Sequence, residues 1–120
     1  MKIIISPLAR TQVLSIAQRS VEAFAQVARS YTLLEHIAYQ SSADPDYWTR
    51  FKESDIRIRS SSTLKGNIPI WELYSDYNPH DAQCIALLIE LDEQLQVLGF
   101  CSQNKLRATI IQLIDTWLPC

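Results

Sequence analysis

Apolar residues recur at alternating spacings of three and four along two stretches of the chain, and this periodicity limits the fold more than any other feature of the sequence. An apolar stripe with this spacing is typical of a helix that buries one face. The first stretch consists of Leu14, Ala17, Val21, Phe24, Ala28 and Tyr31. The second consists of Cys84, Leu88, Leu91, Leu95 and Leu98. We therefore expect both stretches to be helical and to be buried in one core.

Start and stop signals for helices flank these stretches. Ser6–Pro7 provides a capping hydroxyl followed by proline at the first helical position. Asn78–Pro79 repeats that combination before the second stretch, and Gly99 stands where a glycine commonly ends a helix. Ser102 then caps a last helix that Pro119 ends. The signals predict a helical hairpin at the C-terminal end of the chain.

Glycine is scarce, and its scarcity excludes several structures. The two glycines of the chain, Gly66 and Gly99, are too far apart for a phosphate-binding loop or a dinucleotide fingerprint. A strand pair over residues 84–101 is the alternative to the second helix, with its turn at Asp92–Glu93. We reject this alternative because such a turn favours glycine or asparagine.

Together these patterns predict an all-α fold, a compact four-helix-type bundle that forms a single helical domain over residues 1–120. Of its 120 residues, 48% are hydrophobic, which is enough for one core. One long helix or two consecutive helices fit the N-terminal stretch, with a bend near Ser30 in the second case. Residues 57–68 lack a helical period and are rich in serine, so we expect an irregular segment there.

The sequence has few groups for metal or nucleophilic chemistry. Its histidines are His36 and His80, and its three cysteines, Cys84, Cys101 and Cys120, form no Cys-x-x-Cys pair. A structural zinc site needs four ligands, usually in close pairs. His80 and Cys84 are one helical turn apart, but a thiol in an apolar stripe is inert. We therefore predict no metal and no cofactor, and we favour a function other than catalysis.

One spacing indicates an alternative, enzymatic function. Arg29 and His36 are separated by six residues. This arrangement resembles the Arg-x(4–6)-His active-site motif of the HEPN ribonucleases, which are compact helical bundles that work as dimers. The resemblance implies that Arg29 stabilises phosphate and that His36 does acid/base or orienting work. It covers eight residues, lacks the asparagine that commonly follows the arginine, and lies earlier in the chain than in that family.

Residues 48–77 combine aromatic and basic side chains, the types enriched at binding hot spots because they offer large rigid surfaces with a polar group. We predict that this segment carries the binding surface. Its residues are Trp48, Arg50, Phe51, Lys52, Arg57, Arg59, Trp71, Tyr74 and Tyr77. Two other interpretations stay open: the tryptophans close one end of the core, or the side chains stack RNA bases beside a basic patch.

The charge distribution argues against a nucleic-acid duplex as the main partner. The net charge is −2, and residues 67–103 contain six acidic residues and no lysine or arginine. Duplex-binding domains usually carry a dominant basic face. We therefore expect a small acidic protein-interaction module of the adaptor, assembly-subunit, immunity or inhibitor type. Its partner is another protein, with a homodimer as a second option; RNA binding is the alternative.

The sequence also bears on location. Three apolar residues precede Ser6–Pro7, fewer than a secretory signal needs, and the longest wholly apolar run, Cys84–Ile89, is far shorter than the ~20 residues that span a bilayer. The odd number of cysteines fits a reducing compartment. We expect a cytoplasmic protein without membrane contact.

Overall fold

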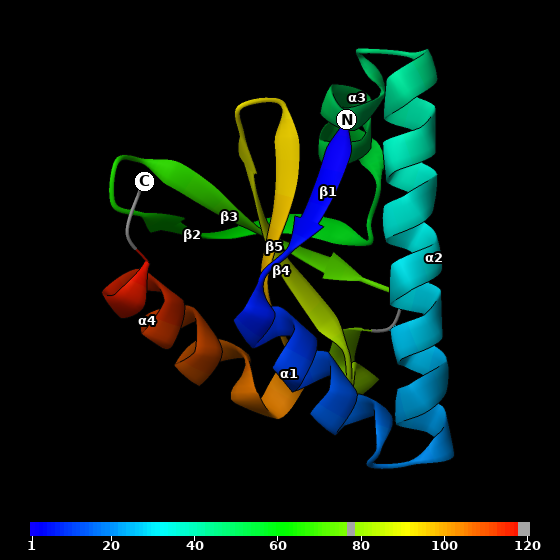
Figure 1. Cartoon of the computed structure of the whole chain (residues 1–120), viewed down its shortest axis with the longest axis vertical. Helices are drawn as coiled ribbons and strands as arrows, with labels where there is room; N and C mark the ends of the chain where they lie inside the picture. Colours follow the sequence, from blue (N-terminus) through cyan, green and yellow to red (C-terminus); the bar gives the residue numbers. More distant parts are fainter. Residues whose placement is uncertain (77–78, 118–120) are drawn as a thin grey trace.

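The computed structural model describes residues 1–76 and 79–117 and shows an α+β fold, so the expected all-α bundle is wrong (Figure 1). Two 3-10 helices, η1 (Pro79–Asp81) and η2 (Gln103–Lys105), accompany the main elements. In chain order these are β1 (Lys2–Ile5), α1 (Pro7–Ala17), α2 (Val21–Ala43), α3 (Tyr47–Ser54), β2 (Ile58–Leu64), β3 (Ile68–Tyr74), β4 (Ile85–Leu91), β5 (Gln94–Cys101) and α4 (Leu106–Thr116).

The five strands form one mixed sheet in the order β1-β5-β4-β3-β2. β1 runs parallel to β5, and the other neighbours are antiparallel. Both faces of the sheet are covered. Helices α1, α2 and α3 contribute to a core on one face, and α4 contributes to a second core on the other.

Residues 84–101, expected to begin a helical hairpin, are instead the β4–β5 hairpin. Every residue of β4 from Ile85 to Ile89 is fully buried, because one face of this central strand meets each core. A strand buried on both faces is apolar at successive positions, so the alternation that identifies a strand is missing. The turn is at Asp92 and Glu93, both with positive φ (54° and 62°), although neither is the glycine or asparagine such a turn favours.

Residues 57–68 also differ from the expected irregular segment. They form strand β2 and the turn into β3, where Gly66 and Asn67 have the positive φ values (87° and 61°) that favour such residues. The serines lie on β2, an edge strand whose register with β3 shifts between Ser60 and Ser62. Edge strands tolerate polar residues on both faces, which explains the missing apolar pattern.

The structure has helices beginning near the predicted starts at Ser6 and Ser102. Ser6 caps α1 by accepting the Ala9 N–H at 3.1 Å, whereas Ser102 precedes the turn into α4 without a side-chain cap hydrogen bond. The chain breaks between α1 and α2, where Ser20 accepts the Ala23 N–H at 3.0 Å. From there α2 continues without interruption through Ser30. The signals expected at Asn78 and Pro119 lie outside the described residues.

Candidate functional site

The structure brings part of the predicted binding surface together around α3, but the aromatic rings there are mostly buried. Lys52 lies over the rings of Trp48 and Trp71, and Arg57 lies over the ring of Phe51. Trp48 and Phe51 on α3 are 2% and 5% exposed and belong to the core beneath α1–α3, with Trp71 packed against it. Tyr74 is 3% exposed and belongs to the core on the opposite face. The side chains of Trp48, Phe51 and Tyr74 therefore pack into the two cores, in line with the alternative that the aromatic residues close the core. Tyr77 lies outside the described residues.

The basic residues of this segment face carboxylates or aromatic rings. The Lys52 ammonium lies 5.3 Å and 5.5 Å from the ring centres of Trp48 and Trp71, and 3.5 Å from a Glu90 oxygen. The Arg57 guanidinium holds both oxygens of Asp55, which lowers the pKa of that carboxyl group. Arg50 contacts Asp44, and this hydrogen bond likewise lowers the pKa of the Asp44 carboxyl group. These pairs neutralise much of the charge of the expected basic patch.

Arg59, Glu72 and Tyr74 form a polar cluster on the α4 side of the sheet. Arg59 stands opposite Glu72 in the β2–β3 register, and its Nε lies 3.2 Å from Glu72 Oε1. The Tyr74 hydroxyl donates to the same oxygen at 2.7 Å. Burial, helped by this hydrogen bond, raises the pKa of Tyr74 to about 12. A phenol that holds its proton so strongly is unsuited to acid–base chemistry near neutral pH and fits a structural cluster.

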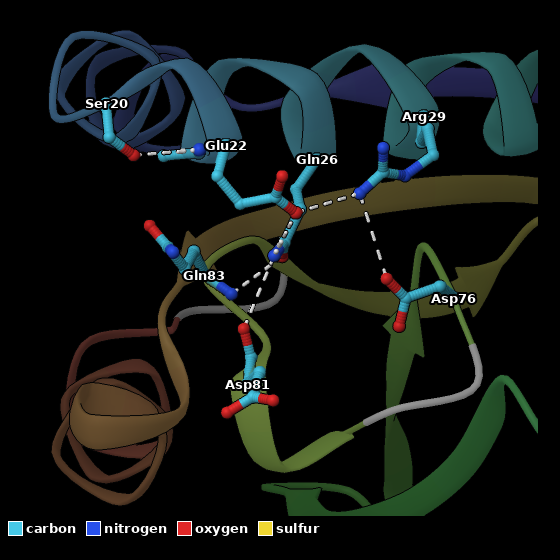
Figure 2. Close-up of polar contacts among 8 residues, drawn as sticks. Ser20, Glu22, Gln26, Arg29, Asp76, Asp81 and Gln83 are labelled. Carbon is cyan, nitrogen blue, oxygen red and sulfur yellow. Dashed lines mark hydrogen bonds and ion pairs between the residues drawn. The ribbon is translucent and has the colours of Figure 1, made fainter.

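A second polar cluster joins the start of α2 to the connection between β3 and β4 (Figure 2). Gln26 is 4% exposed; its amide nitrogen donates to the Asp81 carbonyl at 3.3 Å, and its oxygen accepts the Gln83 N–H at 2.7 Å. Arg29 extends the cluster outward, 3.3 Å from Glu22 and 3.8 Å from Asp76. Gln26 therefore satisfies two backbone groups of an otherwise irregular connection, a role that sequence reasoning missed.

Arg29 and His36, the residues of the ribonuclease alternative, do line one groove. Its volume is about 430 Å³, and Thr32, Arg57 and Ser75 contribute to its walls. His36 is exposed and lies edge-on to the Tyr47 ring, with 6.1 Å between ring centres. The helical bundle implied by the HEPN resemblance is contradicted by the five-stranded sheet. The roles implied for Arg29 and His36 stay predictions.

Metal and thiol chemistry find little support in the described part of the chain. No group of three or more His, Cys, Asp or Glu side chains there is placed to hold a metal ion. Burial raises the pKa of Cys84 to about 11 and that of Cys101 to about 12. Thiols with such pKa values are poor nucleophiles. Among the described helices, none is long and apolar enough to cross a membrane.

The first apolar stripe, expected to be buried, is largely exposed. Leu14 is 63% exposed, Val21 88% and Phe24 61%, and Ala28 is exposed as well. Of the six stripe positions, Ala17 and Tyr31 are half-buried. Helix α2 turns its opposite side inward, and that side contains three buried polar residues, Gln26, Ser30 and Ser41. We name Leu14, Val21, Phe24 and Ala28 the α1–α2 apolar face.

Comparison of the chain with protein-family models, curated proteins and solved structures finds no match. The function is therefore argued from the chemistry of the described surface. The two polar clusters described above are occupied by internal hydrogen bonds and ion pairs, whereas the α1–α2 apolar face is exposed. This arrangement favours binding.

Proposed function

We propose that the protein is a protein-interaction module, that its contact surface is the α1–α2 apolar face, and that the partner bound there is a second copy of the same chain. The observation that carries the proposal is the exposure of Leu14, Val21 and Phe24, all above 60% on two helices that pack together. Large apolar side chains gathered on one face mark interaction sites, because leaving them in water is costly.

The spacing of residues on α2 supports a second copy as the partner. A two-fold axis makes each surface complementary to itself, so that residue i contacts j and j contacts i. If two α2 helices pack antiparallel through their outward sides, with the axis at the height of Gln26 along the helix, the ring of Phe24 lies level with the small side chain of Ala28 in the other copy, and the reverse. The same axis places Val21 against Tyr31 of the other copy. Large against small is the fit that helix packing needs.

Charge complementarity points to the same arrangement. Glu22 and Arg29 lie on one flank of α2, 3.3 Å apart, with side chains 62% and 45% exposed. The axis at Gln26 lies almost midway between these two positions. It therefore brings Glu22 of each copy level with Arg29 of the other on the same side of the helix pair, where the long side chains can reach each other at the edge of the interface and form two ion pairs. Such pairs set orientation and specificity more than affinity.

RNA binding at the groove of Arg29 and His36 is less well supported. Both arginines of that groove, Arg29 and Arg57, already face carboxylates of the chain. RNA phosphates would have to displace these internal partners, whereas an apolar partner at the α1–α2 apolar face displaces only water.

Sedimentation equilibrium tests the proposal. We expect the wild-type chain to be dimeric and Phe24→Asp to be monomeric with an unchanged circular-dichroism spectrum, since Phe24 is already exposed. Ile111→Asp is the matched control: Ile111 is 51% exposed on α4, away from the proposed interface, and its substitution should leave the dimer intact. A wild-type chain that stays monomeric at millimolar concentration would exclude a second copy. Equal dimerisation of Phe24→Asp would exclude this face.

A further inference from the structure

A groove of about 390 Å³ lies between α1 and α4, which run near each other at the same end of the molecule (Figure 1). None of the residues of the α1–α2 apolar face lines it. Buried Ile16 and Phe100 contribute apolar atoms to its floor. Polar side chains form its walls, among them Gln12 and Ser15 from α1 and Lys105 and Gln112 from the α4 side. Its volume is within the range of small-molecule sites.

The charged residues that line this groove are both basic. They are Arg19, which follows α1, and Lys105, which immediately precedes α4. Neither forms an ion pair with any described residue, whereas each arginine from position 29 to position 59 contacts a carboxylate. The groove therefore has two positive charges that the described part of the chain leaves uncompensated.

The uncharged groups of the groove are suited to donate hydrogen bonds as well. Gln12 Oε1 accepts the Phe100 N–H at 2.8 Å, which fixes the amide and leaves its N–H₂ group as a donor on the wall. Gly99 makes this contact feasible, because a Cβ there would lie 2.9 Å from Gln12 Oε1. The hydroxyls of Ser15 and Ser102 add two rotatable donors. The groove thus combines two cations with several hydrogen-bond donors, and no carboxylate is among its lining residues. An anion is the ligand that would pair with these groups.

We propose that this groove binds the phosphate group of a small phosphorylated molecule, held by Arg19 and Lys105 and by donors from Gln12, Ser15 and Ser102. The planar guanidinium of Arg19 can bind two phosphate oxygens at once, and Lys105 adds a point charge.

A neighbouring cavity of about 530 Å³ shares Arg19 and Ser102 with this groove and continues past His80 and Asn104. Asp81 also lines that cavity, so a second anionic group would be disfavoured there. The cavity instead offers room for the unphosphorylated, hydroxyl-bearing part of the molecule.

Titration of the ¹⁵N-labelled protein with glycerol 3-phosphate at constant ionic strength tests this site, with glycerol as the uncharged counterpart. We expect saturable shifts of amide signals between Ser102 and Ala108 with the phosphate and none with glycerol. Arg19→Gln and Lys105→Gln should each weaken binding about tenfold, the usual effect of losing one charge-assisted hydrogen bond. Both residues are exposed, so the variants should remain folded.

Arg10→Gln and Arg107→Gln are the matched controls, because these arginines lie on α1 and α4, the two helices beside the groove, and do not line it. Affinity within twofold of the wild type in both controls, with the loss confined to Arg19 and Lys105, supports the site. The proposal is overturned if the shifts do not saturate, if glycerol produces them, or if all four variants weaken binding equally. Dimerisation is measured separately, so failure here leaves the α1–α2 interface unaffected.

Discussion

Replacing Gln26 with leucine should destabilise the fold by about 1–1.5 kcal/mol. Leucine has a similar size, so little cavity forms, but the Asp81 carbonyl and the Gln83 N–H both lose their side-chain partner. A buried polar group left without a hydrogen bond costs about 1–3 kcal/mol. Asp81 is exposed and Gln83 is half-buried, so the two groups together cost roughly 3 kcal/mol rather than the ~6 kcal/mol of full burial. Burying a more apolar side chain offsets about 1.5–2 kcal/mol of this cost, which leaves a net loss of about 1–1.5 kcal/mol.

Urea unfolding of wild type and variant measures this loss, and amide hydrogen exchange locates it. The Gln83 amide should exchange faster in the variant, because its N–H is donated to Gln26 in the wild type. Gln40→Leu is the control on the same helix: Gln40 is half-buried, and its side chain makes no hydrogen bond with the described residues. Equal unfolding free energies for Gln26→Leu and wild type, or equal losses in both variants, would refute the role given to Gln26.

Three further predictions follow from burial. Leu88→Ala should cost about 2–5 kcal/mol in urea unfolding and Leu91→Ala clearly less, because Leu88 is fully buried and Leu91 is half-buried at the strand end. Stability should fall between pH 10 and pH 12, where the unfolded chain ionises Tyr74 before the folded protein does, and Tyr74→Phe should lose less over this interval. Cys84 and Cys101 should resist thiol reagents until the protein unfolds, as mass-spectrometric mapping of labelled cysteines would show, because burial raises their pKa values.

The helix start at Ser6 could be predicted from the sequence because a cap is a local interaction. A hydroxyl and the N–H groups that follow it are within a few residues of each other, so the signal does not depend on the rest of the fold. The break between α1 and α2 has the same local origin at Ser20.

The sheet could not be predicted in this way, because its strands are defined by distant neighbours. β1 pairs with β5 across most of the chain, and β4 is apolar at successive positions because helices cover both faces of the sheet. When apolar residues occupy successive positions, some of them fall by chance at the spacings of three and four that are typical of a helix, as Leu88, Leu91 and Leu95 do. The positive φ of Asp92 and Glu93 shows that the hairpin forms without the turn residues it normally favours.

The expected burial of the first apolar stripe is wrong for a related reason. The outward side of α2 contains Val21 and Phe24, and its inward side contains polar Gln26, Ser30 and Ser41 among apolar residues such as Val27 and Leu34. Both sides of the helix therefore carry an apolar stripe. Periodicity identifies a stripe but cannot tell which of two faces meets the core. The burial of Trp48 and Tyr74 likewise depends on which face of the sheet each one joins.

Mixing two charge-reversed variants tests the antiparallel α2 interface most directly. In Glu22→Arg, and separately in Arg29→Glu, both proposed ion pairs become like-charged, so each variant alone should dimerise more weakly than the wild type. In an equimolar mixture, both contacts of the heterodimer join a cation of the Glu22→Arg chain to a carboxylate of the Arg29→Glu chain. Within each variant chain, residues 22 and 29 carry like charges and repel each other. Any added stability of the heterodimer must therefore come from contacts between the two chains.

We therefore predict that native mass spectrometry of the mixture shows mainly heterodimer, favoured over either homodimer by about 1–2 kcal/mol, or roughly five- to thirty-fold. A mixture that dimerises no better than its two components, or that populates the heterodimer only at the statistical proportion, would contradict the interface.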